Sequence, residues 1–407
     1  MKLLQIFFKY LQHLRTSLWY NSTQMRKIGI LIERQRAYGR SICSGIAQYA
    51  QGSEDWSLKM LEWEDLDRPK RLQDFDGFIV RILNDRMARI LLRTGKPVVD
   101  VFHERDREGI SAVDQHAVHV GQLAARHFIE HRFTRFAFCG FDGRRYSDAR
   151  RDAFVHCLEL NHFRCEVYPS PPSAISDFDN TVIRRERLAF SVDNGQMEKW
   201  IRSLPKPIGV FCAHDLRAYQ LIEICNQAGI RVPEDVAVLG VDNDELVCNF
   251  VTPTLSSIDL NGKAVGFTAA KLLAEQLDGR ASGPRRVSVD PSGLVERKST
   301  QIYPIDPPWL SDALIFIRNN VSRRLTAADV YAHVKRSHTL VTDAFKRALD
   351  TTVQKEIQRT RLAEALRLVT GTSLSLAEIA VRAGFASMQY FCTSFTAAYG
   401  KPPSAFR

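Results

Sequence analysis

Two pairs of histidines have a spacing that could hold a metal ion. His127 and His131 stand four residues apart and His116 and His119 stand three apart, so each pair would share one face of a helix. The phrase HFIEH differs from the zinc-enzyme motif H-E-x-x-H, and no third ligand is evident near either pair. We therefore predict no metal and no other cofactor.

Motifs for catalysis are also missing from the sequence. It contains no G-x-x-x-x-G-K-[ST] phosphate loop, no G-x-S-x-G nucleophile elbow and no dinucleotide-binding G-x-G-x-x-G. No catalytic residue is predicted. An enzyme, such as a sugar kinase or hydrolase tethered to DNA, is kept only as a remote alternative.

The final 34 residues have the pattern of a helix-turn-helix. Apolar residues at helical spacing lead to Gly384, a turn position suited to positive φ. Ser387 can cap a second helix, whose Tyr390, Phe391 and Phe395 are predicted to lie in the core. Two short helices with this turn are typical of motifs that enter the major groove of DNA.

A comparable pattern stands upstream, at residues 325–349, where Thr326 and Ser337 are predicted helix caps. Residues 351–369 lie between the two motifs and contain no Gly or Pro. Such a helix would be roughly 28 Å long, at 1.5 Å per residue. It would hold two recognition helices about one DNA turn apart on one face of the duplex.

The outward residues of the two recognition helices are the candidates for DNA contact. Gln can pair bidentately with adenine, and Ser, Thr and His can reach base edges or phosphates. The alternative is an ordinary solvated helix face. The candidates are His338, Thr339, Thr342, Asp343 and Lys346 in the first motif and Ser387, Met388, Gln389 and Thr393 in the second.

Charge is concentrated in the same part of the chain. The whole chain has a net charge of +10, and residues 301–407 contain 14 Lys and Arg against eight Asp and Glu. A basic segment beside a nearly neutral body is expected of a module that binds phosphates.

The C-terminal phrase resembles the second DNA-binding motif of the AraC/XylS family of transcription regulators. Thr396 and Pro402 depart from the family pattern, which has a basic residue and Thr there. The resemblance implies a regulator that binds double-stranded promoter DNA as a homodimer and contacts RNA polymerase. The matching residues are Ile379, Ala380, Gly384, Phe385, Tyr390, Phe391, Phe395, Gly400, Pro403, Phe406 and Arg407.

The rest of the chain has the pattern of an α/β protein. From Lys27 onward, short apolar runs such as KIGILIE and VAVLGVD alternate with helical patterns, which predicts parallel sheets covered by helices. About 275 residues exceed one small sheet, so two α/β lobes are expected. The eight cysteines form no C-x-x-C pair and no run approaches 18 apolar residues, as in a cytoplasmic protein without a membrane span.

Phrases at residues 113–140 and 231–300 resemble the periplasmic-binding-protein-like sensor of the LacI/GalR regulators. The resemblance implies that a small sugar, D-xylose foremost, binds in a cleft between the lobes. Asp242 matches the family's ligand-binding Asp in G-x-D, and Arg150 matches the Arg of R-x-x-G-F, although Ala153 replaces the Gly.

Three further effector contacts are predicted. Asp215 and His214 fall where that family has Asn-Asp, and a cap for the following helix is the alternative role for Asp215. Tyr38 follows the first strand, as do Glu33, Arg34 and Arg40, and could line the mouth of the cleft. Carboxylates, Arg and aromatic rings are the groups that satisfy the hydroxyls and C–H faces of a sugar.

Together these patterns predict a sugar-gated activator of sugar-utilisation genes. A repressor, or a regulator of a different sugar or sugar acid, is the alternative. Residues 1–24 are either an extension before a true start at Met25 or a short helix packed on the sensor. The predicted parts are a sensor at 25–300, a linker at 301–310 and a DNA-binding domain at 311–407, with motifs at about 326–349 and 375–398 joined by a helix at about 351–369.

Overall fold

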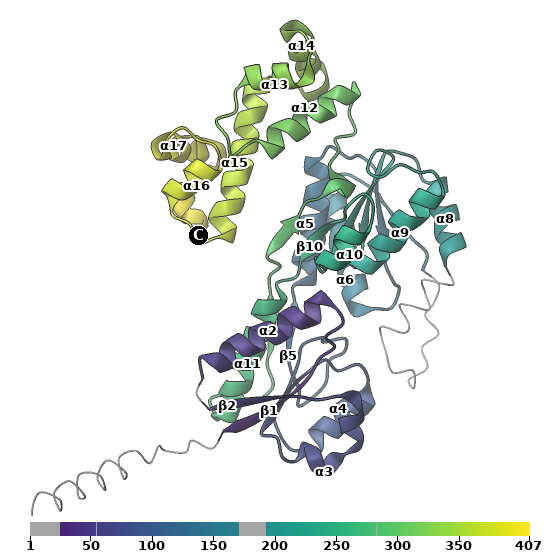
Figure 1. The fold of residues 1–407 in the computed structure, drawn as a ribbon, viewed down its shortest axis with the longest axis vertical. Coiled ribbons are helices and arrows are strands. Elements are labelled where there is room, and N and C mark those ends of the chain that lie inside the picture. Colours follow the sequence, from purple (N-terminus) through teal and green to yellow (C-terminus); the bar gives the residue numbers. More distant parts are fainter. Residues whose placement is uncertain (1–24, 54, 171–192, 282) are drawn as a thin grey trace, which may run out of the picture. The chain divides into compact units, whose positions relative to one another are not determined.

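The computed structural model describes most of the chain (Figure 1). The predicted extension at residues 1–24 lies outside the described residues. Contacts divide the chain into two units, of which one is a first α/β lobe and the other contains a second α/β lobe and a helical domain. The described ranges are 25–53, 55–170, 193–281 and 283–407.

The first lobe is built on a six-stranded parallel sheet in the order β11-β5-β4-β3-β1-β2. Its strands are β1 (Arg26–Leu31), β2 (Trp56–Met60), β3 (Gly77–Val80), β4 (Val98–Asp100), β5 (Ser111–Gln115) and β11 (Arg286–Val289). Its helices are α2 (Ala37–Gln51), η1 (Trp63–Asp67), α3 (Pro69–Leu72), α4 (Asp85–Leu92) and α11 (Gly262–Leu277). Strand β3 is buried along its whole length, which explains its uninterrupted apolar sequence.

The second lobe holds another six-stranded sheet, in the order β12-β10-β9-β8-β6-β7, in which only the β10–β12 pair is antiparallel. Its strands are β6 (Phe136–Cys139), β7 (Cys165–Val167), β8 (Ile208–Cys212), β9 (Val236–Val241), β10 (Ser256–Asp259) and β12 (Gly293–Val295). Its helices are α5 (Ala117–Glu130), α6 (Arg145–Leu160), α8 (Asn194–Ser203), α9 (Asp215–Gln227), α10 (Glu245–Phe250) and η2 (Lys298–Thr300).

The helical domain begins with a helix that the sequence pattern did not delimit, α12. Its helices are α12 (Pro308–Asn319), α13 (Ala327–Val334), α14 (His338–Leu349), α15 (Val353–Gly371), α16 (Leu376–Arg382), α17 (Met388–Tyr399) and η3 (Pro403–Phe406). One apolar core gathers α12, α13, α14 and the start of α15, and a second gathers the end of α15 with α16 and α17. The two parallel-sheet lobes and the all-helical domain confirm the predicted fold class.

The turn after α16 requires glycine. Gly384 has φ +76°, and a Cβ at that position would stand 1.9 Å from the carbonyl oxygen of Val321. The backbone of this turn therefore lies directly against the segment that follows α12, where a side chain would not fit.

Among the described residues, none of the helices combines the length and apolar character needed to traverse a lipid bilayer.

Candidate effector site and nucleic-acid interface

Asp242 directly follows strand β9 of the second lobe and has a strained backbone conformation. Its φ is +109°, and the following residue, Asn243, has φ +48°. Such conformations cost on the order of 1–3 kcal/mol and persist where the surroundings fix them, often at binding sites. Here the N–H of Asp242 donates to the carbonyl of Ile258 at 2.9 Å, and the N–H of Asn243 donates to the hydroxyl of Ser257 at 2.9 Å. The carboxylate of Asp242 thus lies at the end of a parallel strand, which is where such sheets bind ligands.

Asp215 supports this strand end from within the lobe. It is 2% exposed, and its carboxylate accepts the N–H of Asp244 at 2.8 Å and the hydroxyl of Ser257 at 2.5 Å. Burial, and after it the charge of Asp242, raise the pKa of Asp215 well above its ordinary value. A Cβ at Gly240 would stand 2.3 Å from the Asp215 oxygen, so the strand can approach only with glycine there. Both carboxylate oxygens are engaged inside the lobe, which suits positioning of the Asp242 loop.

Arg150 and His214 lie near one another around the same strand ends. Arg150, on α6, is 3% exposed, donates to the carbonyl of Ala213 and lies 5.3 Å from the ring centroid of Tyr146. His214 is the N-cap of α9, and its Nδ1 accepts the N–H of Arg217 at 3.0 Å. The neutral imidazole therefore carries its proton on Nε2, which makes that atom a donor. Its ring stacks on that of Tyr146, with centroids 6.3 Å apart.

The first lobe places a second set of polar residues at its own strand ends. Tyr38 lies in the first turn of α2 and is partly buried against the core of that lobe. Glu33 follows β1 and forms an ion pair with Arg81, which follows β3. The Arg81 guanidinium lies 3.9 Å from the ring centroid of Phe102, so a cation, a carboxylate and an aromatic face occur together.

Sequence reasoning named Glu33 but missed Arg81 and Phe102. The available signal was a charged residue directly after an apolar strand, in the phrase DGFIVRI. The pairing of β1 with β3, in which Leu31 lies opposite Val80, brings the residues after these strands together. The effector residues predicted in the second lobe form one group, and Tyr38 belongs to the separate set in the first lobe.

The helical domain has the expected caps. Thr326 begins α13 with a capping box to Asp329, Ser337 accepts the N–H of Leu340 at 3.3 Å, and Ser387 accepts the N–H of Tyr390 at 3.2 Å. These hydroxyls fix where α13, α14 and α17 begin. The helix between them, α15, has 19 residues and joins the two apolar cores of the domain.

Most of the predicted DNA-contacting residues are exposed. The exception is Thr342, which is half-buried, and Lys346 forms an exposed ion pair with Asp350 at 2.7 Å. The Thr393 hydroxyl donates to the backbone carbonyl of Gln389 at 3.0 Å, and Gln389 lies in the first turn of α17. The exposed candidates are His338, Thr339, Asp343, Lys346, Ser387, Met388, Gln389 and Thr393.

The prediction that Tyr390 lies in the core is wrong. Phe391 and Phe395 are fully buried, whereas Tyr390 is 49% exposed and meets Phe385 only edge-on. Tyr390 is one position away from Phe391 on the helix, so about 100° of rotation carries it towards the solvent side. It belongs to the exposed surface of the second motif.

A buried cluster joins the second lobe to the helical domain. His131, at the end of α5, has Nδ1 2.7 Å from the carbonyl of His127, so this nitrogen carries the proton. Its Nε2 accepts from Arg318 of α12 at 3.1 Å, and Arg318 also forms an ion pair with Glu296 at 2.7 Å. Tyr303 stacks on the His131 ring, with centroids 5.0 Å apart.

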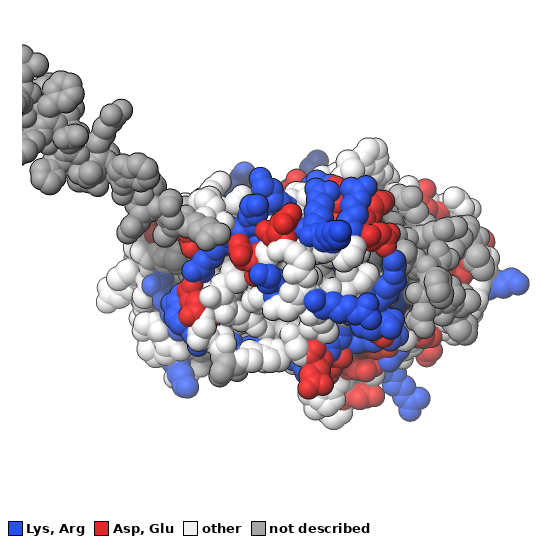
Figure 2. Space-filling model, turned by 90° about the horizontal axis from the view of Figure 1, so that it is seen from below, with Lys and Arg blue, Asp and Glu red and all other residues white. Residues whose placement is uncertain are grey.

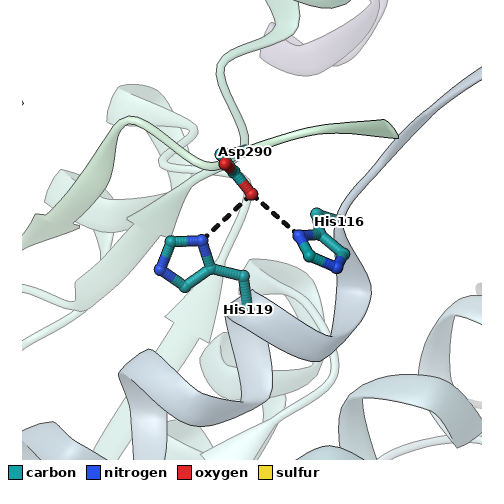
Figure 3. A group of neighbouring side chains, drawn as sticks. All are labelled: His116, His119 and Asp290. Carbon is teal, nitrogen blue, oxygen red and sulfur yellow. Dashed lines mark hydrogen bonds and ion pairs between the residues drawn. The ribbon is translucent and has the colours of Figure 1, made fainter. Parts of the chain in front are cut away.

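A carboxylate from a distant part of the chain lies beside each histidine pair. Asp290 lies beside His116 and His119 (Figure 3), and Glu296 lies beside His127 and His131. Both carboxylates are more than 160 residues away in sequence from the histidines that they contact.

Charges on the first lobe are locally compensated. Arg71 pairs with Asp65 at 2.6 Å, and Arg107 pairs with Asp85 at 3.2 Å. On the face seen in Figure 2, Lys and Arg side chains lie beside Asp and Glu side chains. Residues 25–300 contain 39 Lys and Arg against 38 Asp and Glu, so the two lobes together are nearly neutral, whereas residues 301–407 are basic.

Comparison with protein-family models identifies two regions. A periplasmic binding protein-like domain matches residues 125–300, and a helix-turn-helix domain matches residues 331–407. The first match begins within α5 and covers the rest of the second lobe together with α11 and β11 of the first lobe, and the second match lies in the helical domain. The two matches follow the order that the sequence patterns predicted.

Two curated relatives are similar over nearly the whole chain. The xylose operon regulatory protein of Haemophilus influenzae is 27% identical and covers 94% of this chain and 98% of its own length. The protein of that name from Escherichia coli K12 is 28% identical and covers 95% of this chain and 97% of its own length.

Two solved structures are also similar to the chain. The structure of the xylose-binding transcription activator xylR matches with a TM-score of 0.57 and 26% identity, over 94% of this chain and 98% of its own. A ribose-bound LacI family regulator from Enterococcus faecium matches with a TM-score of 0.53 and 20% identity, over 68% of this chain and 98% of its own, and supports the fold of the two lobes.

Proposed function

We infer that this chain is a DNA-binding, sugar-responsive transcription regulator similar to the xylose operon regulatory proteins. The inference rests on two structural parts that occur together in one chain. One is a pair of helix-turn-helix motifs on a single helix, α15, and the other is a two-lobed α/β body with polar residues at its strand ends. The similarity to xylose operon regulators covers both parts.

We propose that the effector is a pentose, with D-xylose as the first candidate. Asp242 accepts hydrogen bonds from sugar hydroxyls, whereas Arg150 and the Nε2–H of His214 donate to them. Charged groups and aromatic faces that converge at strand ends are what such a ligand needs. Tyr38, Glu33, Arg81 and Phe102 supply the contacts of the first lobe. Asp215 acts through the loop that holds Asp242, because its own oxygens are engaged by Asp244 and Ser257.

We propose that α14 and α17 enter successive major grooves of promoter DNA. Residues at the N-terminal end of each helix read bases, as is usual for such motifs, and nearby Lys and Arg hold phosphates. Gln389 and His338 are the first candidates for base contact, since both stand in the first turn of their helices and are exposed.

The regulator acts as a homodimer in the cytoplasm and recruits RNA polymerase to sugar-utilisation promoters. Sugar favours the DNA-binding arrangement only if it binds that arrangement more tightly than the alternative, because a ligand shifts only the equilibria that it discriminates. No catalytic step belongs to this function.

A sugar acid is the second candidate effector. The guanidinium of Arg150 lies at the strand ends of the second lobe, and Arg pairs bidentately with carboxylates. A uronate would use this feature where a neutral pentose would not.

Calorimetric titration of the full chain with D-xylose, L-arabinose, D-ribose, D-glucose and D-xyluronate tests the proposal. Saturable binding of D-xylose, lost in Asp242→Asn and kept in the exposed control Asp74→Asn, is the expected result. Binding of another sugar or of the uronate alone replaces the effector but keeps the regulator. If no ligand changes the DNA affinity in a promoter-binding assay, the sugar-gated function is wrong.

A further inference from the structure

The side chains of His116, His119 and Asp290 converge on one point (Figure 3). The Nδ1 atoms of His116 and His119 lie 2.8 Å and 3.1 Å from the same Asp290 oxygen. The three side chains are 47%, 37% and 66% exposed, so an ion from solution could reach them without opening the fold.

The backbone around this group is held by regular structure. His116 is the N-cap of α5 and His119 stands in its first turn, so the spacing of three residues places both on one face. Asp290 follows β11 directly, and β11 pairs with β5, in which Gln115 lies opposite Val289. The pairing of these strands therefore fixes Asp290 next to His116 before any ligand is considered.

We propose that His116, His119 and Asp290 form a binding site for a divalent transition-metal ion of the Zn²⁺ type. Zn²⁺ binds His nitrogen and carboxylate oxygen at about 2.0–2.2 Å. Ligand atoms at those bond lengths stand about 3.3 Å apart around a tetrahedral ion. The two distances of 2.8 Å and 3.1 Å would therefore need to widen by only a few tenths of an ångström when an ion replaces the hydrogen bonds. The ion would take the place of the protons now shared between the two imidazoles and the carboxylate, and water would complete its coordination.

The ligand set selects the kind of metal. Two imidazoles and one carboxylate suit Zn²⁺, Ni²⁺ and Cu²⁺, whereas Mg²⁺ and Ca²⁺ prefer oxygen ligands alone. Three protein ligands on an exposed surface give moderate, micromolar affinity rather than the closed coordination of a structural zinc site. The affinity falls at low pH, because the histidines must lose protons to bind the ion.

The second group of possible ligands, His127, His131 and Glu296, differs in one respect. The guanidinium of Arg318 already contacts both His131, at 3.1 Å, and Glu296, at 2.7 Å. A positive group thus occupies the position between these ligands, and a metal ion there would be repelled. Only the exposed group is proposed as a site.

The site lies where the chain passes between the two contact-defined units. The chain passes from one contact-defined unit to the other between Gln115 and His116 and again between Val289 and Asp290. A metal held by His116 and Asp290 would link two of these passing segments to each other. This inference does not depend on the identity of the sugar or of the DNA site.

Competition between the full chain and a chromophoric chelator for Zn²⁺ at pH 7.5 tests the site, after bound metal has been stripped. One equivalent with micromolar affinity is expected. His119→Ala and Asp290→Asn should each weaken binding by about 10–100-fold or more, since even outer partners of metal ligands matter by that factor. The matched control His156→Ala removes an exposed histidine from α6 and should leave the affinity unchanged.

Co²⁺ gives a second readout that does not depend on affinity alone. Visible absorption bands of bound Co²⁺ should appear with the wild-type chain and disappear in both site variants. Absence of saturable Zn²⁺ binding would overturn the proposal. Binding that survives in His119→Ala and Asp290→Asn, or that is lost in His131→Ala instead, would also overturn it. Titration with the sugar in the same samples reports on the proposed function separately.

Discussion

The guanidinium of Arg318 lies 2.7 Å from the carboxylate of Glu296 and so connects the first helix of the helical domain to the second lobe. The same guanidinium donates to Nε2 of His131. These contacts form a polar connection between the second lobe and the helical domain.

Arg318→Gln is expected to uncouple sugar binding from DNA binding. The variant removes the cation shared by Glu296 and His131 but leaves the strand-end residues untouched. Sugar affinity should stay within about twofold, whereas the sugar-dependent change in DNA affinity, typically 5–150-fold in coupled systems, should largely disappear. Calorimetry and promoter-binding assays with and without sugar measure the two quantities. An unchanged sugar response in Arg318→Gln, matching that of the exposed control Arg324→Ala, would contradict this role.

The buried His127 is expected to make the free energy of unfolding depend on pH. Burial, followed by the charges of His131 and Arg318, holds the pKa of His127 well below its ordinary value. The carboxylate of Glu296 also belongs to this cluster and lies 3.3 Å from Nε2 of His131. Below about pH 6.5 the unfolded chain binds a proton that the folded chain excludes, so the free energy of unfolding should fall by up to about 1.4 kcal/mol per pH unit. Above that pH the contribution is constant.

Chemical denaturation followed by tryptophan fluorescence at pH 7.5 and pH 5.5 checks this expectation. The loss of stability at pH 5.5 should be smaller in His127→Gln than in the wild type. The exposed control His156→Gln should behave as the wild type does. Equal losses in all three proteins would show that another group controls the effect.

Gln389→Ala is expected to relax DNA specificity at one base position. An amide at the start of a recognition helix can pair with adenine, and loss of such a contact costs about 1–3 kcal/mol. Binding to a set of single-base operator variants measures the effect. Gln354→Ala, on the exposed side of α15, is the matched control and should leave the preference intact. A uniform loss over all operators would instead assign Gln389 to the phosphate backbone.

Gly384→Ala is expected to disrupt the second motif. The new Cβ would stand 1.9 Å from the Val321 carbonyl, and φ of +76° disfavours any side chain. Destabilisation of more than about 2 kcal/mol is expected, since both strain and a backbone clash contribute. Gly371→Ala is the control, because a Cβ there meets nothing within 4 Å. Thermal unfolding and DNA affinity should separate the two variants, and similar behaviour would contradict the account of this turn.

The sequence predicted features that depend on neighbours in the chain. The caps Thr326, Ser337 and Ser387 and the turn at Gly384 were predicted because a hydroxyl or a missing side chain acts on residues only a few positions away. The buried parallel strands were predicted for the same reason, since β9 is a continuous apolar run. Helix α15 was expected at 351–369 and spans Val353–Gly371.

Features that depend on distant pairing were missed. Asp290 joins His116 only through the pairing of β11 with β5, and Arg81 meets Glu33 only through the pairing of β3 with β1. The exposure of Tyr390 depends on which face of α17 meets the core, which an aromatic residue alone does not reveal. Short edge strands such as β11, which is half exposed, lack the apolar run that marks a buried strand.

The lobes and the helical domain differ in how easily recombination could exchange them. Each lobe is assembled from stretches of chain that are far apart in sequence, so no single recombination event can replace one lobe without breaking the other. The helical domain is one continuous stretch that is entered once, through the segment before α12. A new DNA-reading end can therefore be joined to an existing sensor in one step, provided that it brings an Arg318 equivalent to meet His131 and Glu296.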